Sequence, residues 1–251
     1  KNPEVRDYIC DVICFWVKEF DIDGIRLDAA DVLDFDYMKA LRHVANEVKS
    51  DFWLMGEVIH GDYNRWVNEG ILHSVTNYHL HKALFSGHND HNYFEIAHTV
   101  KRLYEMGGNR PEGLKLYNFV DNHDVNRLAS TVTDQRDLPL CYTLMYTMPG
   151  IPSIYYGSEY GVRGIHENNS DDGLRPCLDL GAMQSENTEL YHHLVKLGRI
   201  YKAYPALRTG GYRTVQIRNR QLVFAKELDG QTVYVALNLD DQPFDVQFGT
   251  P

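Results

Sequence analysis

Apolar residues recur at helical spacing through the first twenty residues of the chain, and this pattern has a clear starting point. Asn2 is a favourable N-cap, Pro3 fits the first helical position, and Glu4 suits the first turn. The apolar positions that follow are Val5, Ile9, Val12, Ile13, Trp16 and Phe20. We therefore predict a helix that begins after Asn2 and buries this apolar face.

Helical and strand-like patterns then alternate along most of the chain. Helices are predicted near residues 36–49, 92–106, 137–147 and 188–204, the last of them ending at Pro205. The predicted strands are the runs Asp23–Asp28, Trp53–Glu57, Ser74–Leu80, Leu116–Asp124 and Ser153–Gly157. Strands separated by helices are typical of a parallel α/β fold, because parallel neighbours need a crossover connection.

The pattern changes after Gly210-Gly211, where we place a domain boundary. Strands are predicted at Val215–Ile217, Leu222–Lys226 and Thr232–Leu239, and Asp229-Gly230 predicts a hairpin turn between the last two. We therefore expect an α/β domain over residues 1–209 and an antiparallel β domain over residues 210–251.

Three of the predicted strands lead into a carboxylate: Asp28, Glu57 and Asp124. In a parallel α/β barrel the C-terminal ends of all strands open on one face, so three such acids would converge on one pocket. A nucleophile, a general acid and a supporting carboxylate are what cleavage of a glycosidic bond requires. The sequence therefore predicts a glycosidase site on this face.

Strand alternation predicts how the first of these acids is placed. Arg26 and Asp28 share one face, while Ile25 and Leu27 share the other and would pack outward against helices. A neighbouring arginine favours the ionised carboxylate that a nucleophile needs, although a strand-end salt bridge without a catalytic role is the simpler alternative. Glu57 follows an apolar run, a setting that favours the protonated form of a general acid.

Several segments resemble sequence motifs of the α-amylase family of glycoside hydrolases. They are Asp23–Asp28, Gly56-Glu57, Phe119–Asp124 and Pro152–Glu159, in the family's order and spacing. The resemblance implies a partial TIM (β/α)8 barrel made of its last five strands, followed by the incomplete start of a β-sandwich. It also implies that the N-terminal half of the barrel is missing from this chain, so we expect residues 1–251 alone to be inactive unless a partner segment completes the barrel.

The resemblance carries roles to individual residues. Asp28 matches the nucleophile, Glu57 the acid/base and Asp124 the transition-state stabiliser, while Arg26 and His123 match residues that orient the nucleophile and grip sugar hydroxyls. The further substrate-binding candidates are Asn122, His60 and Tyr78. The implied mechanism is a retaining double displacement, with the two catalytic carboxyl groups about 5–5.5 Å apart.

The resemblance also narrows the substrate to α-1,4-linked glucans or maltodextrins. His60 and the Ser74–Tyr78 stretch are similar to the cyclomaltodextrinase and neopullulanase branch, although Ile59 stands where that branch has a tryptophan. A transglycosylase with the same covalent intermediate is the alternative, because water and a sugar hydroxyl compete at the second step. Ala30–Leu33 lacks the lysine and histidine that calcium-dependent α-amylases carry. No cofactor is therefore expected to be required, and calcium stays an open but weakened alternative.

Two other readings use the same sequence differently. His79 and His81 would lie at a strand end, followed by His88, Asp90 and His91, and such histidines can hold a catalytic metal in barrel hydrolases. That reading leaves the three acids unexplained. A non-catalytic amylase-like protein is the other alternative, and the presence of all three acids weighs against it.

Loops around the predicted pocket hold further candidates. One or two aromatic residues would stack on sugar rings while the rest fill the shell between helices and strands; the candidates are Tyr63, Trp66, Tyr78 and Tyr93. The polar loop from Tyr160 to Gln184 would rim the pocket. Its Asp171, Asp172 and Arg175 are left out of the predicted catalytic set, because a solvated loop is the simpler explanation.

Composition excludes some partners. A formal net charge of -10 argues against nucleic acid and against an anionic membrane, and a neutral polysaccharide needs no charge steering. The four cysteines, Cys10, Cys14, Cys141 and Cys177, are expected to be buried free thiols, which favours a reducing, cytoplasmic location. Localisation otherwise stays open, since a signal segment would lie outside this sequence.

Overall fold

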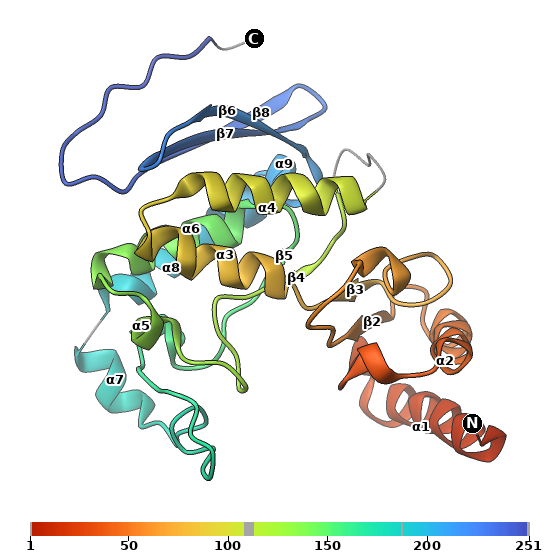
Figure 1. Cartoon of the computed structure of the whole chain (residues 1–251). Coiled ribbons are helices and arrows are strands. Elements are labelled where there is room, and N and C mark those ends of the chain that lie inside the picture. Colours follow the sequence, from red (N-terminus) through yellow and green to blue (C-terminus); the bar gives the residue numbers. More distant parts are fainter. Residues whose placement is uncertain (1, 108–112, 187, 250–251) are drawn as a thin grey trace. The chain divides into compact units, whose positions relative to one another are not determined.

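The computed structural model describes residues 2–107, 113–186 and 188–249, and the chain divides into two compact units. The first unit holds Lys1–Tyr78 and Leu114–Tyr117, and the second holds His79–Gly113 and Asn118–Pro251. Figure 1 labels their helices and strands. Each unit is described by itself below.

Parallel strands and helices alternate in the first unit. Its elements are α1 (Pro3–Phe20), β1 (Gly24–Leu27), η1 (Ala30–Val32), α2 (Phe35–Val48), β2 (Trp53–Gly56), η2 (Tyr63–Arg65) and β3 (Ser74–Val75). The strands form one sheet in the order β1-β2-β3, and both pairings are parallel. The predicted α/β alternation is therefore confirmed here. Asp28 directly follows β1, and Glu57 directly follows β2.

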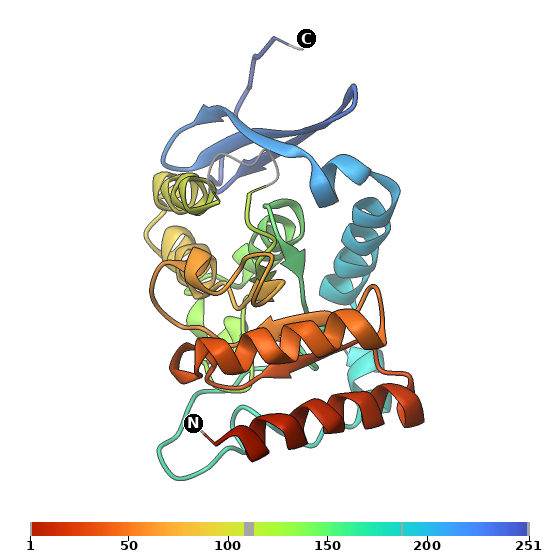
Figure 2. The same ribbon diagram turned by 90° about the vertical axis from the view of Figure 1, so that its right-hand side faces the viewer.

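The first helix begins as its sequence predicts but does not bury the predicted face. The Asn2 side chain accepts a hydrogen bond from the Glu4 backbone N–H, and Pro3 opens the helix. α2 packs beside α1 (Figure 2), and Ile13 is buried. By contrast, Trp16 is 42% exposed and Phe20 66% exposed, so the predicted burial of the whole stripe is wrong for the described chain. The reason is that α2 covers one side of α1 and leaves the rest of its apolar stripe in solvent.

The second unit is mainly helical. The elements that follow β3 along the chain, up to the C-terminal sheet, are α3 (Tyr78–Asn89), α4 (Tyr93–Met106), β4 (Tyr117–Asn118), α5 (Leu128–Thr131), η3 (Gln135–Asp137), α6 (Leu138–Thr147), β5 (Ile151–Pro152), η4 (Ser158–Tyr160), α7 (Leu180–Glu186), α8 (Glu189–Ala203) and α9 (Pro205–Thr209). β4 and β5 pair with each other, and the Ser153 N–H donates to the Asn118 carbonyl at 2.9 Å. The predicted helices near 92–106, 137–147 and 188–204 are confirmed within two residues.

Three predictions of strands need correction. The strand predicted over Ser74–Leu80 ends at Val75, and α3 begins at Tyr78 because Leu80, Leu84 and their neighbours are buried at helical spacing. Residues 153–157, predicted as a strand, form none, because the strand β5 lies directly before them and a turn begins at Tyr156. The strand predicted over Leu116–Asp124 is limited to β4, and a loop carries residues 119–124.

The C-terminal sheet follows its predicted pattern closely. β6 (Gly211–Ile217), β7 (Gln221–Leu228) and β8 (Gln231–Asn238) are antiparallel neighbours in chain order. Asp229 and Gly230 join β7 to β8 with φ angles of 47° and 81°, as a two-residue hairpin turn requires. α4 and α9 contact this sheet. Among the described helices, none combines the length and apolar character needed to cross a membrane.

Candidate active site

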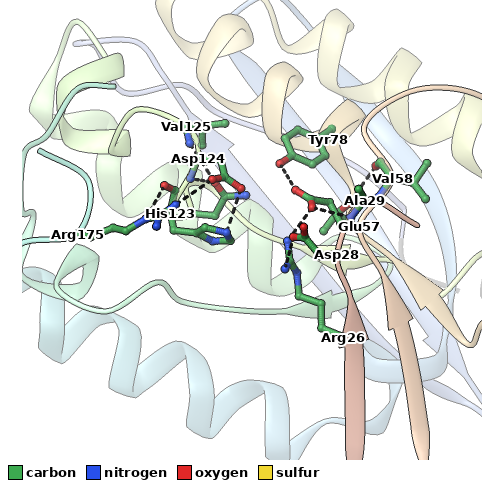
Figure 3. Close-up of polar contacts among 12 residues, drawn as sticks. Arg26, Asp28, Ala29, Glu57, Val58, Tyr78, His123, Asp124, Val125 and Arg175 are labelled. Atoms are coloured by element: carbon green, nitrogen blue, oxygen red, sulfur yellow. Dashed lines mark hydrogen bonds and ion pairs between the residues drawn. The ribbon is translucent and has the colours of Figure 1, made fainter. Parts of the chain in front are cut away.

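One arginine joins two of the predicted catalytic acids in the first unit. Arg26, on β1, donates from Nη1 to Asp28 Oδ1 at 3.1 Å, and its Nη2 lies 2.9 Å from Glu57 Oε2. Figure 3 shows both carboxyl groups around this guanidinium. Strand alternation brings Arg26 and Asp28 to the same face, as predicted, and the parallel pairing of β1 with β2 places Glu57 beside them.

The Glu57 carboxyl is buried in a polar setting. Its residue is 8% exposed, and its oxygens accept hydrogen bonds from the Ala29 N–H and the Tyr78 hydroxyl, each at 3.3 Å. The apolar setting predicted for this acid is therefore wrong, because the arginine and two further donors surround it. Tyr78, a predicted substrate-binding residue, contacts the acid itself.

Close backbone packing fixes the segment that carries Glu57. The Glu57 N–H donates to the Leu27 carbonyl and its own carbonyl accepts from Ala30 N–H, both at 2.8 Å. At Gly56 a Cβ atom would lie 2.7 Å from Ala30 Cβ and 2.5 Å from a Leu72 methyl group. A glycine is therefore required immediately before the acid.

A second cluster of predicted residues lies in the second unit, on the loop that follows β4. His123 Nε2 is 3.0 Å from Asp124 Oδ2, and Asn122 Oδ1 accepts from the backbone N–H groups of Asp124 and Val125. The asparagine therefore forms a local turn that presents the aspartate. Figure 3 shows this group with its ion pairs.

The structure brings Arg175, which lies outside the predicted catalytic set, to Asp124. Arg175 Nη2 lies 3.3 Å from Asp124 Oδ1, and its Nε donates to the His123 carbonyl at 3.4 Å. The same guanidinium pairs with Asp171 at 2.9 Å. Its loop position gave no periodic signal, and an arginine followed by proline in a polar loop does not by itself indicate a partner.

The other residues predicted to contact a sugar lie outside these two clusters. His60 is exposed on the loop after β2. Tyr63, Trp66 and Tyr93 are buried core residues, so they fill the interior rather than offer a face to a sugar. Of the aromatic candidates, Tyr78 is the one that contacts a predicted catalytic side chain.

Two histidines of the metal hypothesis, His81 and His88, are buried in α3, whereas His91 is exposed in the turn after that helix. His79 and His81 lie in α3, not at a strand end, and the described residues hold no group of three metal-ligating side chains. His81 stacks on Phe119 with ring centroids 4.9 Å apart, and burial lowers its pKa to about 4. His88 contacts the Leu84 carbonyl through Nδ1, and burial likewise lowers its pKa to about 4.

The four cysteines are free, but their predicted burial holds only in part. Cys141 is buried and Cys10 is half-buried, whereas Cys14 and Cys177 are exposed. Exposure of Cys14 has the same cause as the exposure of the apolar residues on α1, since it lies on the same helix.

The α-amylase catalytic-domain family model matches residues 1–189. The chain belongs to the α-amylase family. It is 31% identical to a cyclomaltodextrinase of Geobacillus thermopakistaniensis over 98% of this chain and 41% of that protein. It is 27% identical to an intracellular maltogenic amylase of Bacillus subtilis over 94% of this chain and 40% of that protein. The chain thus spans about two fifths of the length of these curated relatives.

The fold is that of the α-amylase family as well. An α-amylase of Geobacillus thermoleovorans, solved in complex with acarbose, superimposes with a TM-score of 0.81 and 27% identity, over 95% of this chain and 53% of that one. The chain therefore has the TIM-barrel fold of the family with a C-terminal antiparallel sheet. The contacts described above group the predicted site residues into two clusters. The first holds Arg26, Asp28, Glu57 and Tyr78, and the second holds Asn122, His123 and Asp124. That the two clusters face a single sugar stays a prediction.

Proposed function

We propose that this chain carries the catalytic residues of a retaining α-glycoside hydrolase that acts on α-1,4-linked glucans and maltodextrins. The observation that carries the proposal is the Arg26 guanidinium, which contacts Asp28 and Glu57 together at 3.1 and 2.9 Å. A guanidinium is small, so both carboxyl groups lie close to one another. Retaining glycosidases need such closely spaced carboxyl groups, because one of them must attack the sugar directly.

In the proposed first step, an Asp28 oxygen forms a bond to the anomeric carbon as the glycosidic bond breaks. Glu57 gives its proton to the departing oxygen. In the second step Glu57 takes a proton from water, which displaces Asp28 and releases the sugar with its original configuration. Arg26 orients Asp28 and favours its ionised form, and it stabilises the Glu57 carboxylate that remains once the proton has left.

Asp124 is proposed to stabilise the oxocarbenium-like transition state through the hydroxyl groups of the sugar ring. Both of its oxygens already have polar neighbours, His123 Nε2 at 3.0 Å from one and the Arg175 guanidinium at 3.3 Å from the other. Such preorganised polar groups lower the barrier only where their contacts strengthen in the transition state. His123 would contact the same sugar hydroxyls, with Asn122 holding the turn.

The proposed substrate class draws on the relatives. One is named a cyclomaltodextrinase and another an intracellular maltogenic amylase. The second name, together with four free cysteines, supports a reducing compartment for this protein. We propose no nucleic acid or membrane partner. We also propose that no cofactor is required, since the two displacements need only the carboxyl groups and their arginine and histidine neighbours.

The barrel itself is proposed to be completed by further segments. A TIM barrel has eight parallel strands, and the described residues supply five short strands ahead of the C-terminal sheet, β1 to β5. The exposed apolar side chains of α1, such as Trp16 and Phe20, support a neighbouring helix layer on that side. Activity is therefore expected from the complete enzyme, meaning residues 1–251 together with the segments that finish the barrel.

Product analysis on the complete enzyme tests this function. Maltoheptaose, a cyclodextrin and pullulan would be incubated with the wild-type enzyme and with the Asp28→Asn and Glu57→Gln variants. We expect retained anomeric configuration in the products and a loss of roughly 10³-fold or more in each variant. Products longer than the substrate would indicate sugar transfer instead of hydrolysis. Inverted products, or full activity in Asp28→Asn, would contradict the proposal.

A further inference from the structure

The loop between η4 and α7 reaches the proposed stabiliser through one side chain. Arg175 contacts the segment 123–124 at two points, donating from Nε to the His123 carbonyl and from Nη2 to Asp124 Oδ1. His123 Nε2 occupies the other oxygen of the same carboxyl group. The aspartate is thus held from both sides, and one of the holders comes from a loop 51 residues away in sequence.

A buried arginine anchors the loop that carries Arg175. Arg127 is fully buried, and its Nη2 donates to the carbonyl of Leu174, the residue before Arg175, at 2.8 Å. Its backbone N–H donates to the Gly164 carbonyl at 3.0 Å. The Arg127 side chain therefore holds the end of the loop, while its main chain holds the beginning.

Arg127 is itself held by buried polar groups. Its Nη1 donates to Ser158 Oγ at 3.0 Å and to the Tyr156 carbonyl at 2.6 Å. Ser158 Oγ lies 2.9 Å from both carboxyl oxygens of Asp121, and Asp121 Oδ2 also accepts from the Leu128 N–H. The guanidinium carbon lies 4.1 Å from the centroid of the Tyr155 ring. These contacts fix the arginine in one orientation, which a solvated loop would not need.

The two arms of the loop also approach each other closely. A Cβ atom added at Gly164 would lie within 1.9 Å of the Gly173 carbonyl oxygen, and one added at Gly173 would lie 2.6 Å from the Ile165 carbonyl oxygen. Two glycines therefore permit a backbone contact that no side chain would allow. Asn126 and Ser130 add hydrogen bonds to the His166 and Gly164 N–H groups, at 2.7 and 2.9 Å. The loop is thus fastened to the segment that follows Asp124.

We propose that Arg175 is a positioning residue for Asp124, and that the buried Asp121–Ser158–Arg127 chain exists to hold Arg175 in place. This inference rests on the proposed function and deepens it. The bridge needs two N–H groups in a fixed fork, one for the His123 carbonyl and one for the Asp124 carboxyl, and only arginine supplies that geometry. Because Arg175 is 43% exposed, its ion pair adds little to stability, and its effect is instead expected on the alignment of Asp124.

The test compares three variants of the complete enzyme on a maltodextrin. Arg175→Ala removes the bridge, and Arg175→Lys keeps the charge but replaces the planar fork of donors by a single nitrogen. Arg213→Ala is the matched control, because Arg213 is 47% exposed and pairs with a single carboxylate, Glu227, across the C-terminal sheet. Thermal melting of each variant checks that it folds.

We expect kcat to fall about 10- to 100-fold in Arg175→Ala and by a similar factor in Arg175→Lys, with KM changed little, because the bridge aligns a group that acts in the transition state. Arg213→Ala should match the wild type. The inference is overturned if Arg175→Lys restores wild-type kcat, or if Arg175→Ala loses no more than Arg213→Ala. A wild-type enzyme without turnover would overturn the proposed function, and this inference with it.

Discussion

His81 should make the free energy of unfolding fall by about 2 kcal/mol between pH 7 and pH 5, and replacing His81 by asparagine should abolish that fall. His81 is buried in α3, its Nδ1 lies 2.9 Å from the Val120 carbonyl, and its ring stacks on Phe119. Burial disfavours the charged imidazolium and is the main cause that lowers its pKa, from 6.5 to about 4, while the hydrogen bond to Val120 acts in the opposite direction.

The direction of the effect follows from which state binds the proton. Above pH 6.5 the histidine is neutral in both states, and its full contribution to stability is present. As the pH falls towards 4, the unfolded chain binds a proton that the folded protein excludes, so the free energy of unfolding decreases. The loss amounts to about 2 kcal/mol at pH 5 and about 3 kcal/mol at pH 4, and it levels off below that pH.

Urea unfolding of the purified protein at pH 7, 6 and 5 measures this pH dependence of the free energy of unfolding. Asparagine also removes the ring contact with Phe119, which should lower stability by a similar amount at every pH, so the decisive quantity is the difference between pH 7 and pH 5. His43→Asn is the control, because His43 is an exposed histidine of α2 in a surface pair with Glu47. An unchanged pH dependence in His81→Asn, or an equal change in His43→Asn, would refute the reasoning.

Three further predictions test separate parts of the structure. Gly56→Val should destabilise the first unit by about 1–3 kcal/mol, measured by urea unfolding, because its side chain would collide with Ala30 and Leu72; a wild-type midpoint would contradict the packing around Glu57. Gly230→Ala should cost about 1 kcal/mol in the same assay, since φ is 81° and the added methyl group meets no neighbour; no loss would argue against the left-handed turn. Dialysis of the complete enzyme against EDTA should leave kcat on a maltodextrin unchanged; activity that is lost with EDTA and restored by calcium would instead revive a metal-dependent reading.

The elements that sequence predicts best are those with a long or strongly marked pattern. α2 and α4 agree with their predicted ranges within a residue, and the Asp229-Gly230 turn lies where the hairpin signal places it. The sequence does not predict α3, because the alternate spacing of the histidines in its first turn is also typical of a strand. The two-residue strands β3, β4 and β5 are too short for any periodicity to define their ends.

The candidate site divides in the same way. Arg26 and Asp28 could be paired from sequence, because a strand fixes which side chains share a face. The contact of Arg175 with Asp124 depends instead on the path of a long loop, which is set by buried hydrogen bonds of Arg127 and by two glycines. Local sequence patterns do not predict the path of such a loop, so the sequence alone favours a solvated Arg175.

A crystal structure of the complete enzyme with bound acarbose would test the central claim most directly, since acarbose is the ligand in a similar α-amylase structure. We predict that Asp28, Glu57 and Asp124 all contact the same ring of the ligand, with the carboxyl groups of Asp28 and Glu57 about 5–5.5 Å apart. A ligand bound away from any one of these three side chains would contradict it. A separation of about 6.5–9.5 Å, which leaves room for a water molecule, would replace retention by inversion.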